Sequence, residues 1–90
     1  MGSWDVEYTG KVLSELAKLD KPLRRQIIDR IEWFAEHFDE LTPAPLHGEW
    51  KGFFKFRIGD WRVVYHFESP KQLIKVHQID RRDKIYKRRK

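Results

Sequence analysis

Three cationic side chains, Lys55, Arg57 and Arg62, have the types and the spacing needed for chemistry on an anion. They lie in the segment GFFKFRIGDWRVVYHF, residues 52–67, whose alternating pattern around a central Gly-Asp pair predicts a β-hairpin. In that hairpin Arg57 faces Arg62, and all three cations share one face because side chains alternate along each strand. Like charges placed opposite each other destabilise a sheet, so the arrangement favours an anionic partner.

The other face of the same hairpin is apolar and is expected to form core. It carries Phe54, Phe56, Ile58, Trp61, Val63, Tyr65 and Phe67. Cations on the exposed face suit successive phosphates, which relieve the repulsion between them. Exposed sheet faces also carry Lys and Arg for solubility and edge protection, and this simpler interpretation stays open, above all for Lys55.

Composition bounds the class of protein. A chain of 90 residues, 40% apolar and 14% aromatic, is expected to be one domain over residues 1–90 with a packed core. The sequence has no cysteine, and we expect no metal centre and no cofactor. It has no hydrophobic run of membrane-spanning length and no signal peptide, so we expect a cytoplasmic protein without a membrane partner. The net charge of +5 favours a polyanionic partner.

The expected elements are one strand, two helices and three further strands. In chain order they are a strand at residues 4–8, a helix from a Thr9 cap to about Leu19, a second helix from an Asp20 cap to Phe38 or Leu41, the hairpin, and a strand from Leu73 to about Ile79. This order predicts an α+β fold, β-α-α-β-β-β, in which an N-terminal helical hairpin packs on one face of an antiparallel-rich twisted sheet.

The facing of the last strand stays open. Either Ile74 and Val76 point inward with His77 and Ile79 outward, or Leu73, His77 and Ile79 form the buried set.

The chain ends on a basic segment, RRDKIYKRRK, whose last eight residues are expected to form a short helix or an ordered tail. Arg81 or Arg82 reaches the cationic face if the last strand pairs beside Arg62. Tyr86 then lies close enough to stack on a base or to hydrogen-bond a phosphate.

Histidine is a frequent general acid or base near neutral pH, so the four histidines are also candidate catalytic residues. His37 lies late in the second helix, away from the cations. His66 faces the same side as the cations but toward the far end of the hairpin, and His77 projects outward in one of the two facings. For each of the four a structural or surface role is the simpler interpretation. Trp50 and Phe53, near a loop and on the outer side, are candidate contacts for a partner.

The stretch LHGEWKGFFKFRIGDWRVVYHF, followed by a strand and RRDKIY, resembles the RelE/ParE superfamily of bacterial toxins from type II toxin–antitoxin pairs. The opening WDVEYTGKVLSELAKLDKPLRRQIIDRI is similar to that family's first strand and helical hairpin, so the resemblance covers nearly the whole chain. It implies a compact sheet with two helices on one side and a concave basic face on the other. RelE-like members cut messenger RNA in the ribosomal A site, and ParE-like members poison DNA gyrase.

For a RelE-like member, the resemblance implies a site on the cationic face. Carried over residue by residue, the catalytic set is Lys55, Arg57, Arg62, Arg82 (or Arg81) and Tyr86. Apart from that set, the basic charge pattern predicts further nucleic-acid contacts at Lys51, Arg81, Lys84, Lys87 and Arg88, with the run at residues 87–90 supplying nonspecific electrostatics. This full set of basic residues and a tyrosine favours RNA cleavage. The short hairpin turn and the close spacing of Arg82 and Tyr86 depart from some members.

The residue types fit metal-independent attack by the RNA's own 2′-hydroxyl. Arg62 is predicted to clamp the scissile phosphate, because its planar fork does not readily give up a proton. Lys55 is the candidate proton carrier, since neighbouring cations favour loss of its proton. Tyr86 orients or activates the 2′-hydroxyl, or stacks on the base, and Arg82, or else Arg57, stabilises or protonates the leaving oxygen.

The expected partners are a cognate antitoxin, acidic and partly disordered when free, and the ribosome with its messenger RNA. The antitoxin would wrap the sheet or cover the basic face in a hetero-oligomer. Two other functions stay open: a ParE-like gyrase inhibitor, and a non-catalytic RNA-binding module or decayed toxin.

Overall fold

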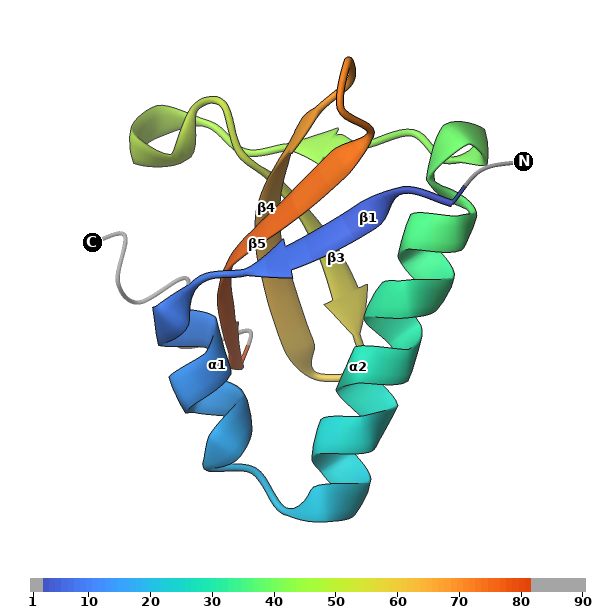
Figure 1. Ribbon diagram of the computed structural model, residues 1–90. Coiled ribbons are helices and arrows are strands. Elements are labelled where there is room, and N and C mark those ends of the chain that lie inside the picture. The colour runs from blue at the N-terminus through green and yellow to red at the C-terminus, as the bar shows by residue number, and fades with distance from the viewer. Residues whose placement is uncertain (1–2, 82–90) are drawn as a thin grey trace.

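The computed structural model describes residues 3–81, in which a five-stranded sheet carries two helices on one side (Figure 1). The elements are β1 (Asp5–Tyr8), α1 (Gly10–Ala17), α2 (Lys21–Glu36), β2 (Ala44–Pro45), β3 (Phe54–Ile58), β4 (Trp61–Glu68) and β5 (Leu73–Arg81), with short 3₁₀ turns at Phe38–Glu40 and Gly48–Trp50. The predicted α+β order is confirmed, with the two-residue strand β2 as an addition. The predicted C-terminal helix or tail lies outside the described residues.

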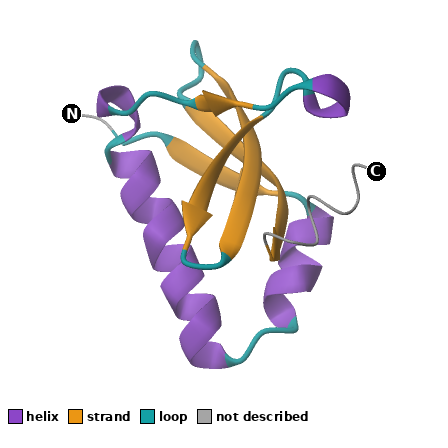
Figure 2. Ribbon diagram, turned by 180° about the vertical axis from the view of Figure 1, so that it is seen from behind, coloured by secondary structure: helices purple, strands orange, loops and turns teal. Residues whose placement is uncertain are grey.

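The strand order is β1-β5-β4-β3-β2, so the first strand lies beside the last one (Figure 1). Figure 2 shows the same sheet and helices from behind. β1 runs parallel to β5, and the other neighbouring strands are antiparallel. β4 therefore lies in the middle of the sheet, with β3 and β5 on either side. Within the described residues, no helix is long and apolar enough to cross a membrane.

α1 begins at the predicted cap. The hydroxyl oxygen of Thr9 accepts a hydrogen bond from the backbone N–H of Val12 at 3.3 Å, which satisfies one of the free donors of the first turn. Val12 and Leu16, one turn apart, are both buried. The cap and this apolar stripe fix which side of α1 faces the sheet.

α2 begins after Asp20, as predicted, with Pro22 in its first turn. The Asp20 side chain makes no capping hydrogen bond. The helix ends at Glu36 rather than at Phe38 or Leu41, because the chain tightens there into the 3₁₀ turn that begins at Phe38.

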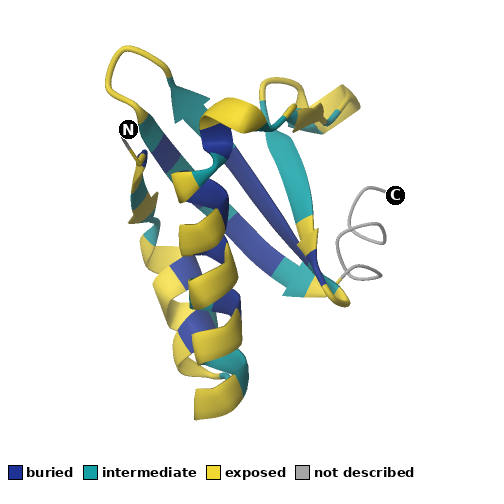
Figure 3. Ribbon diagram, turned by 90° about the vertical axis from the view of Figure 1, so that its right-hand side faces the viewer, coloured by how far each residue is buried: buried dark blue, intermediate teal, exposed yellow. Residues whose placement is uncertain are grey.

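The core lies between the helices and the sheet face that they cover, which we call the inner face (Figure 3). One cluster contains Val12, Leu16, Ile27 and Ile31 of the helices with Ile58, Val63, Val76 and Ile79 of the strands, and a second contains Trp4, Phe34, Ala35, Phe38, Tyr65 and Ile74. The opposite side of the sheet is called the outer face. Burying these apolar side chains between the two layers drives the fold.

The hairpin of β3 and β4 has the predicted register, with Arg57 opposite Arg62 and Ile58 opposite Trp61. Gly59 in its turn has a φ of 60°, which glycine adopts without the strain that a Cβ brings. A positive φ at the first turn position suits the right-handed twist of the two strands.

β5 differs from both facings that the sequence left open. Ile74, Val76 and Ile79 are all buried, whereas His77 is half-buried on the outer face. The reason is a β-bulge: Val64 of β4 pairs with residue 78 and the next residue pairs with Val76, so His77 is an extra residue. A bulge shifts the alternation by one position, which simple period-two reasoning does not include.

Candidate nucleic-acid interface

Lys55 and Arg57 of β3 and Arg62 of β4 line one pocket of about 440 Å³. Arg57 is exposed and Lys55 is half-buried, whereas Arg62 is only 5% exposed. The three predicted cations are therefore brought together. The three cations differ most in burial: Arg62 is surrounded by neighbouring side chains, which restricts the movement of its guanidinium.

On the outer face Arg62 lies between a cationic neighbour on one strand and an acidic neighbour on the other. Its register partner on β3 is Arg57, and its register partner on β5 is Asp80. The like charges of the arginine pair destabilise the sheet on one side, and the carboxylate of the Asp80 position offsets part of that cost on the other.

The same pocket has an apolar wall that the sequence did not reveal. Phe34 of α2 and Phe56 of β3 stack with ring centroids 3.9 Å apart, and both line the pocket with Leu41 and Tyr65. β2 pairs only with the first two residues of β3, so the pocket lies beside the uncovered part of that strand. Cations beside aromatic rings provide the two kinds of contact that a nucleotide needs, for phosphate and for base.

Two histidines also meet on the outer face. His77 Nε2 lies 3.2 Å from His66 Nδ1, and Phe53 packs edge-on against His77 with ring centroids 4.9 Å apart. Burial, and then the neighbouring His66 and Lys75, lower the pKa of His77. Sequence reasoning placed His66 on this face but missed the pair, because the bulge that creates it depends on the pairing of β4 with β5.

Comparison of the sequence with models of known protein families identifies a toxin family. The sequence model of the family described as ParE toxin of type II toxin-antitoxin system, parDE, matches residues 6–86. The chain belongs to this toxin family. No match was found among the curated proteins.

Solved structures of RelE toxins share the fold of this toxin. For the toxin–antitoxin complex RelBE2 from Mycobacterium tuberculosis the TM-score is 0.78 at 20% identity, covering 90% of this chain and 100% of that chain. For the isolated E. coli RelE toxin it is 0.70 at 19% identity, covering 96% and 94%. For the archaeal RelE–RelB complex from Pyrococcus horikoshii OT3 it is 0.69 at 19% identity, covering 90% and 97%. The predicted RelE/ParE superfamily is confirmed, and these likenesses establish the fold.

Two further predicted contacts of the toxin, Lys51 and Arg81, do not line the cationic pocket. Arg81 pairs with Trp61, whose ring packs on the core, so its register position belongs to the inner face, unlike that of Arg62. Lys51 is exposed in the turn before β3. Arg82, Lys84, Tyr86, Lys87 and Arg88 lie outside the described residues and stay predictions.

His37 of the toxin does not line the cationic pocket. His37 Nδ1 lies 2.8 Å from the carbonyl oxygen of Trp33 in α2, so His37 is away from the cations, as predicted. Among residues 3–81, no group of three or more potential ligands is placed to hold a metal ion.

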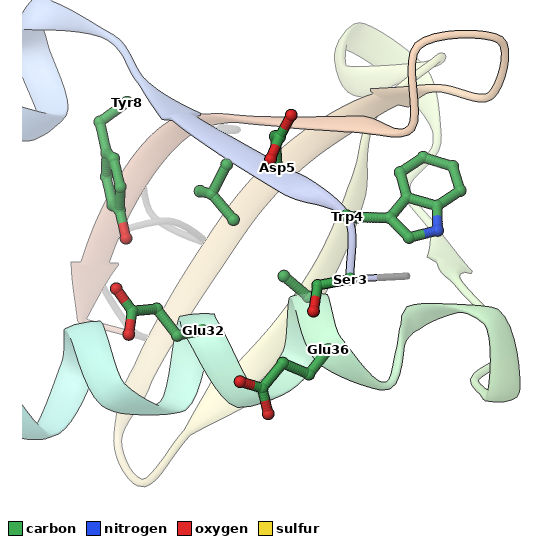
Figure 4. A pocket seen from close by; sticks show the side chains of 8 residues that line it. Ser3, Trp4, Asp5, Tyr8, Glu32 and Glu36 are labelled. Carbon is green, nitrogen blue, oxygen red and sulfur yellow. The ribbon is translucent and has the colours of Figure 1, made fainter. Parts of the chain in front are cut away.

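A second pocket, of about 270 Å³, lies between β1 and α2 and is acidic (Figure 4). Asp5, Glu32 and Glu36 line it, and the Tyr8 side chain extends from β1 toward α2. Burial, together with the charge of Glu32, raises the pKa of Tyr8 to about 12. Carboxylates repel phosphates, so nucleic acid is expected at the cationic pocket and not here.

Proposed function

We propose that this toxin is a ribosome-dependent endoribonuclease that cleaves messenger RNA in the A site by attack of the RNA's own 2′-hydroxyl. The observation that carries the proposal is the convergence of Lys55, Arg57 and Arg62 on one pocket. In-line attack adds negative charge to the phosphorane, and cations fixed before the reaction stabilise that charge without reorganising. The RelE fold of the chain supports the same interpretation.

Each cation has a role that its environment suits. Arg62, buried within the sheet surface, holds the scissile phosphate, because little freedom remains for its guanidinium to lose on binding. Lys55 carries a proton to or from the reacting oxygens. Arg57, which is exposed, closes over the phosphate from the β3 side. Arg82 and Tyr86 complete this proposed set, with Arg82 at the leaving oxygen and Tyr86 at the 2′-hydroxyl or the base.

The proposed partners follow from this role. The ribosome holds the message in the in-line shape that the toxin by itself does not impose, which implies action in the cytoplasm. An antitoxin neutralises the toxin, as the complexes among its structural neighbours suggest. An acidic antitoxin segment over the cationic pocket would compete directly with RNA phosphates.

The test is primer extension on messenger RNA bound to ribosomes. Wild-type toxin is expected to produce cuts within the A-site codon, and Lys55→Ala is expected to lose them. Lys71→Ala removes a matched cation from an exposed turn, where its side chain is 72% exposed, and should cut normally. A message left intact by wild-type toxin, or cut equally by Lys55→Ala, would reject the proposal.

The family match favours one second candidate, a ParE-like gyrase inhibitor. Expression of the toxin in cells separates the two. Rapid translation arrest with cut transcripts supports cleavage, whereas double-strand DNA breaks with filamentation support gyrase inhibition. RNA retention without either effect would indicate a non-catalytic binding module.

A further inference from the structure

Two imidazoles on the outer face lie beyond the cationic pocket. The bulge in β5 places His77 Nε2 3.2 Å from His66 Nδ1 of β4. Phe53 packs against both rings, with centroids 4.9 Å from His77 and 5.9 Å from His66, and Trp50 packs edge-on against Phe53. Both histidines are half-buried, so the pair has an apolar flank and is partly exposed to solvent.

The histidine pair lies next to Lys55 on the outer face, two strand residues away along β4. Val64 is the register partner of Lys55, and His66 lies two residues further along β4 on the same face. Two residues of a strand span about 7 Å. This separation is comparable to the distance between neighbouring phosphates of an extended RNA strand.

The hydrogen bond between the two imidazoles limits how many protons the pair carries. A hydrogen bond between two imidazoles needs one nitrogen with a proton and one without, so the neutral pair satisfies itself. One added proton leaves this hydrogen bond in place, whereas charging both rings would place two cations 3.2 Å apart. Burial, and then His66 and Lys75, lower the pKa of His77.

The charged groups around the pair include both carboxylates, which favour a protonated imidazole, and lysines, which disfavour it. The groups that face the pair are Lys55 on β3, Glu68 on β4, Lys75 on β5 and Glu7 on β1. Glu68 lies 3.9 Å from His66 Nε2 but also 3.5 Å from Lys71, so its charge is shared. Lys75 is similarly shared with Glu7 at 3.8 Å. A phosphate that accepts from both imidazolium groups would relieve the repulsion that otherwise opposes the charging of both rings.

We propose that His66 and His77 form a second phosphate subsite of the outer face, loaded by proton uptake when RNA binds. The inference rests on the proposed function, since the subsite takes the phosphodiester next to the one at Lys55, Arg57 and Arg62. At neutral pH the lowered pKa of His77 keeps its imidazole uncharged, so the subsite contributes little. At lower pH, proton uptake by His77 completes the subsite and adds one phosphate contact.

The experiment measures binding of a labelled single-stranded 2′-O-methyl oligonucleotide, which cannot be cut by 2′-hydroxyl attack. Fluorescence anisotropy gives the affinity over a range of salt concentrations at about pH 5.5 and about pH 8, on either side of histidine's ordinary pKa. One added contact should steepen the salt dependence at the lower pH by about 0.7 in log–log slope. At about 0.1 M salt that slope corresponds to roughly fivefold tighter binding.

Three variants make the test specific. His77→Gln should lose the steepening, and His77→Lys should show the steeper slope at both pH values because its charge is permanent there. His37→Gln makes the same chemical change in the helix layer and should behave like wild type. A slope change that survives in His77→Gln, or is lost in His37→Gln, would overturn the subsite while leaving the cleavage proposal intact. Absence of oligonucleotide binding by wild type at both pH values would instead count against the RNA function itself.

Discussion

Arg62 is buried in the sheet surface and lines the cationic pocket. A guanidinium held in this way can present its donors to a phosphate in one orientation, which a flexible surface lysine does not do. Arg57 and Lys55 lie around it with more freedom. We infer that Arg62 fixes the position of the phosphate and that the other two cations adapt to it.

Two tyrosines with buried hydroxyl groups make stability depend on alkaline pH. The hydroxyl groups of Tyr8 and Tyr65 make no hydrogen bond within residues 3–81, and burial raises both pKa values, that of Tyr8 to about 12. Between pH 10 and pH 12 the unfolded chain loses the Tyr8 proton while the folded chain keeps it. The free energy of unfolding should therefore be fully present below about pH 10 and fall above it.

Replacement by phenylalanine tests this at the residue scale. Tyr8→Phe should leave stability at pH 7 unchanged or slightly higher, because it removes a buried hydroxyl without a partner. It should also reduce the alkaline loss, as measured by urea unfolding at pH 7 and about pH 11. A loss of more than about 1 kcal/mol at pH 7 would show that the hydroxyl is hydrogen-bonded, for instance to water.

At the scale of single elements, the caps of the two helices differ. Thr9 makes its capping bond and Asp20 does not. Thr9→Ala should therefore lower the free energy of unfolding by about 1 kcal/mol. Asp20→Ala should cost only a few tenths, through the helix dipole. Urea unfolding of both variants checks the difference, and equal costs would contradict it.

The hairpin turn gives a second contrast at this scale. Gly59→Ala places a Cβ at a φ of 60° and should destabilise the toxin by roughly 1–2 kcal/mol. Gly10→Ala, in the first turn of α1 with open space around the new Cβ, should be neutral or stabilising. Thermal unfolding of the pair is the measurement, and a harmless Gly59→Ala would indicate that the turn has another conformation.

The sequence predicted the elements better than their long-range pairing. The register of β3 with β4 was accessible because period-two alternation and a Gly-Asp turn are local signals. The parallel pairing of β1 with β5, the short strand β2 and the bulge at His77 depend on contacts between distant segments. For that reason Lys55, Arg57 and Arg62 could be grouped from sequence, whereas the histidine pair and the Phe34–Phe56 wall could not.

At the scale of the whole molecule, two pockets of different charge lie toward opposite edges of the sheet, one beside β3 and one beside β1. The cationic pocket and the histidine pair belong to the outer face and the β3 edge, and the acidic pocket lies on the helix side between β1 and α2. A net charge of +5 attracts polyanions in general. Of the two pockets described above, the cationic one has the lining that suits a polyanion.

The most direct measurement is the single-turnover cleavage rate of ribosome-bound messenger RNA by wild type, Arg62→Ala and Arg25→Ala. Arg25 is an exposed arginine of α2, on the helix side, and circular dichroism confirms that each variant is folded. Arg62→Ala is expected to lower the rate by about 10²–10³-fold, while Arg25→Ala is expected to cut at the wild-type rate. Equal rates for a folded Arg62→Ala and wild type would contradict the claim that this pocket cleaves RNA.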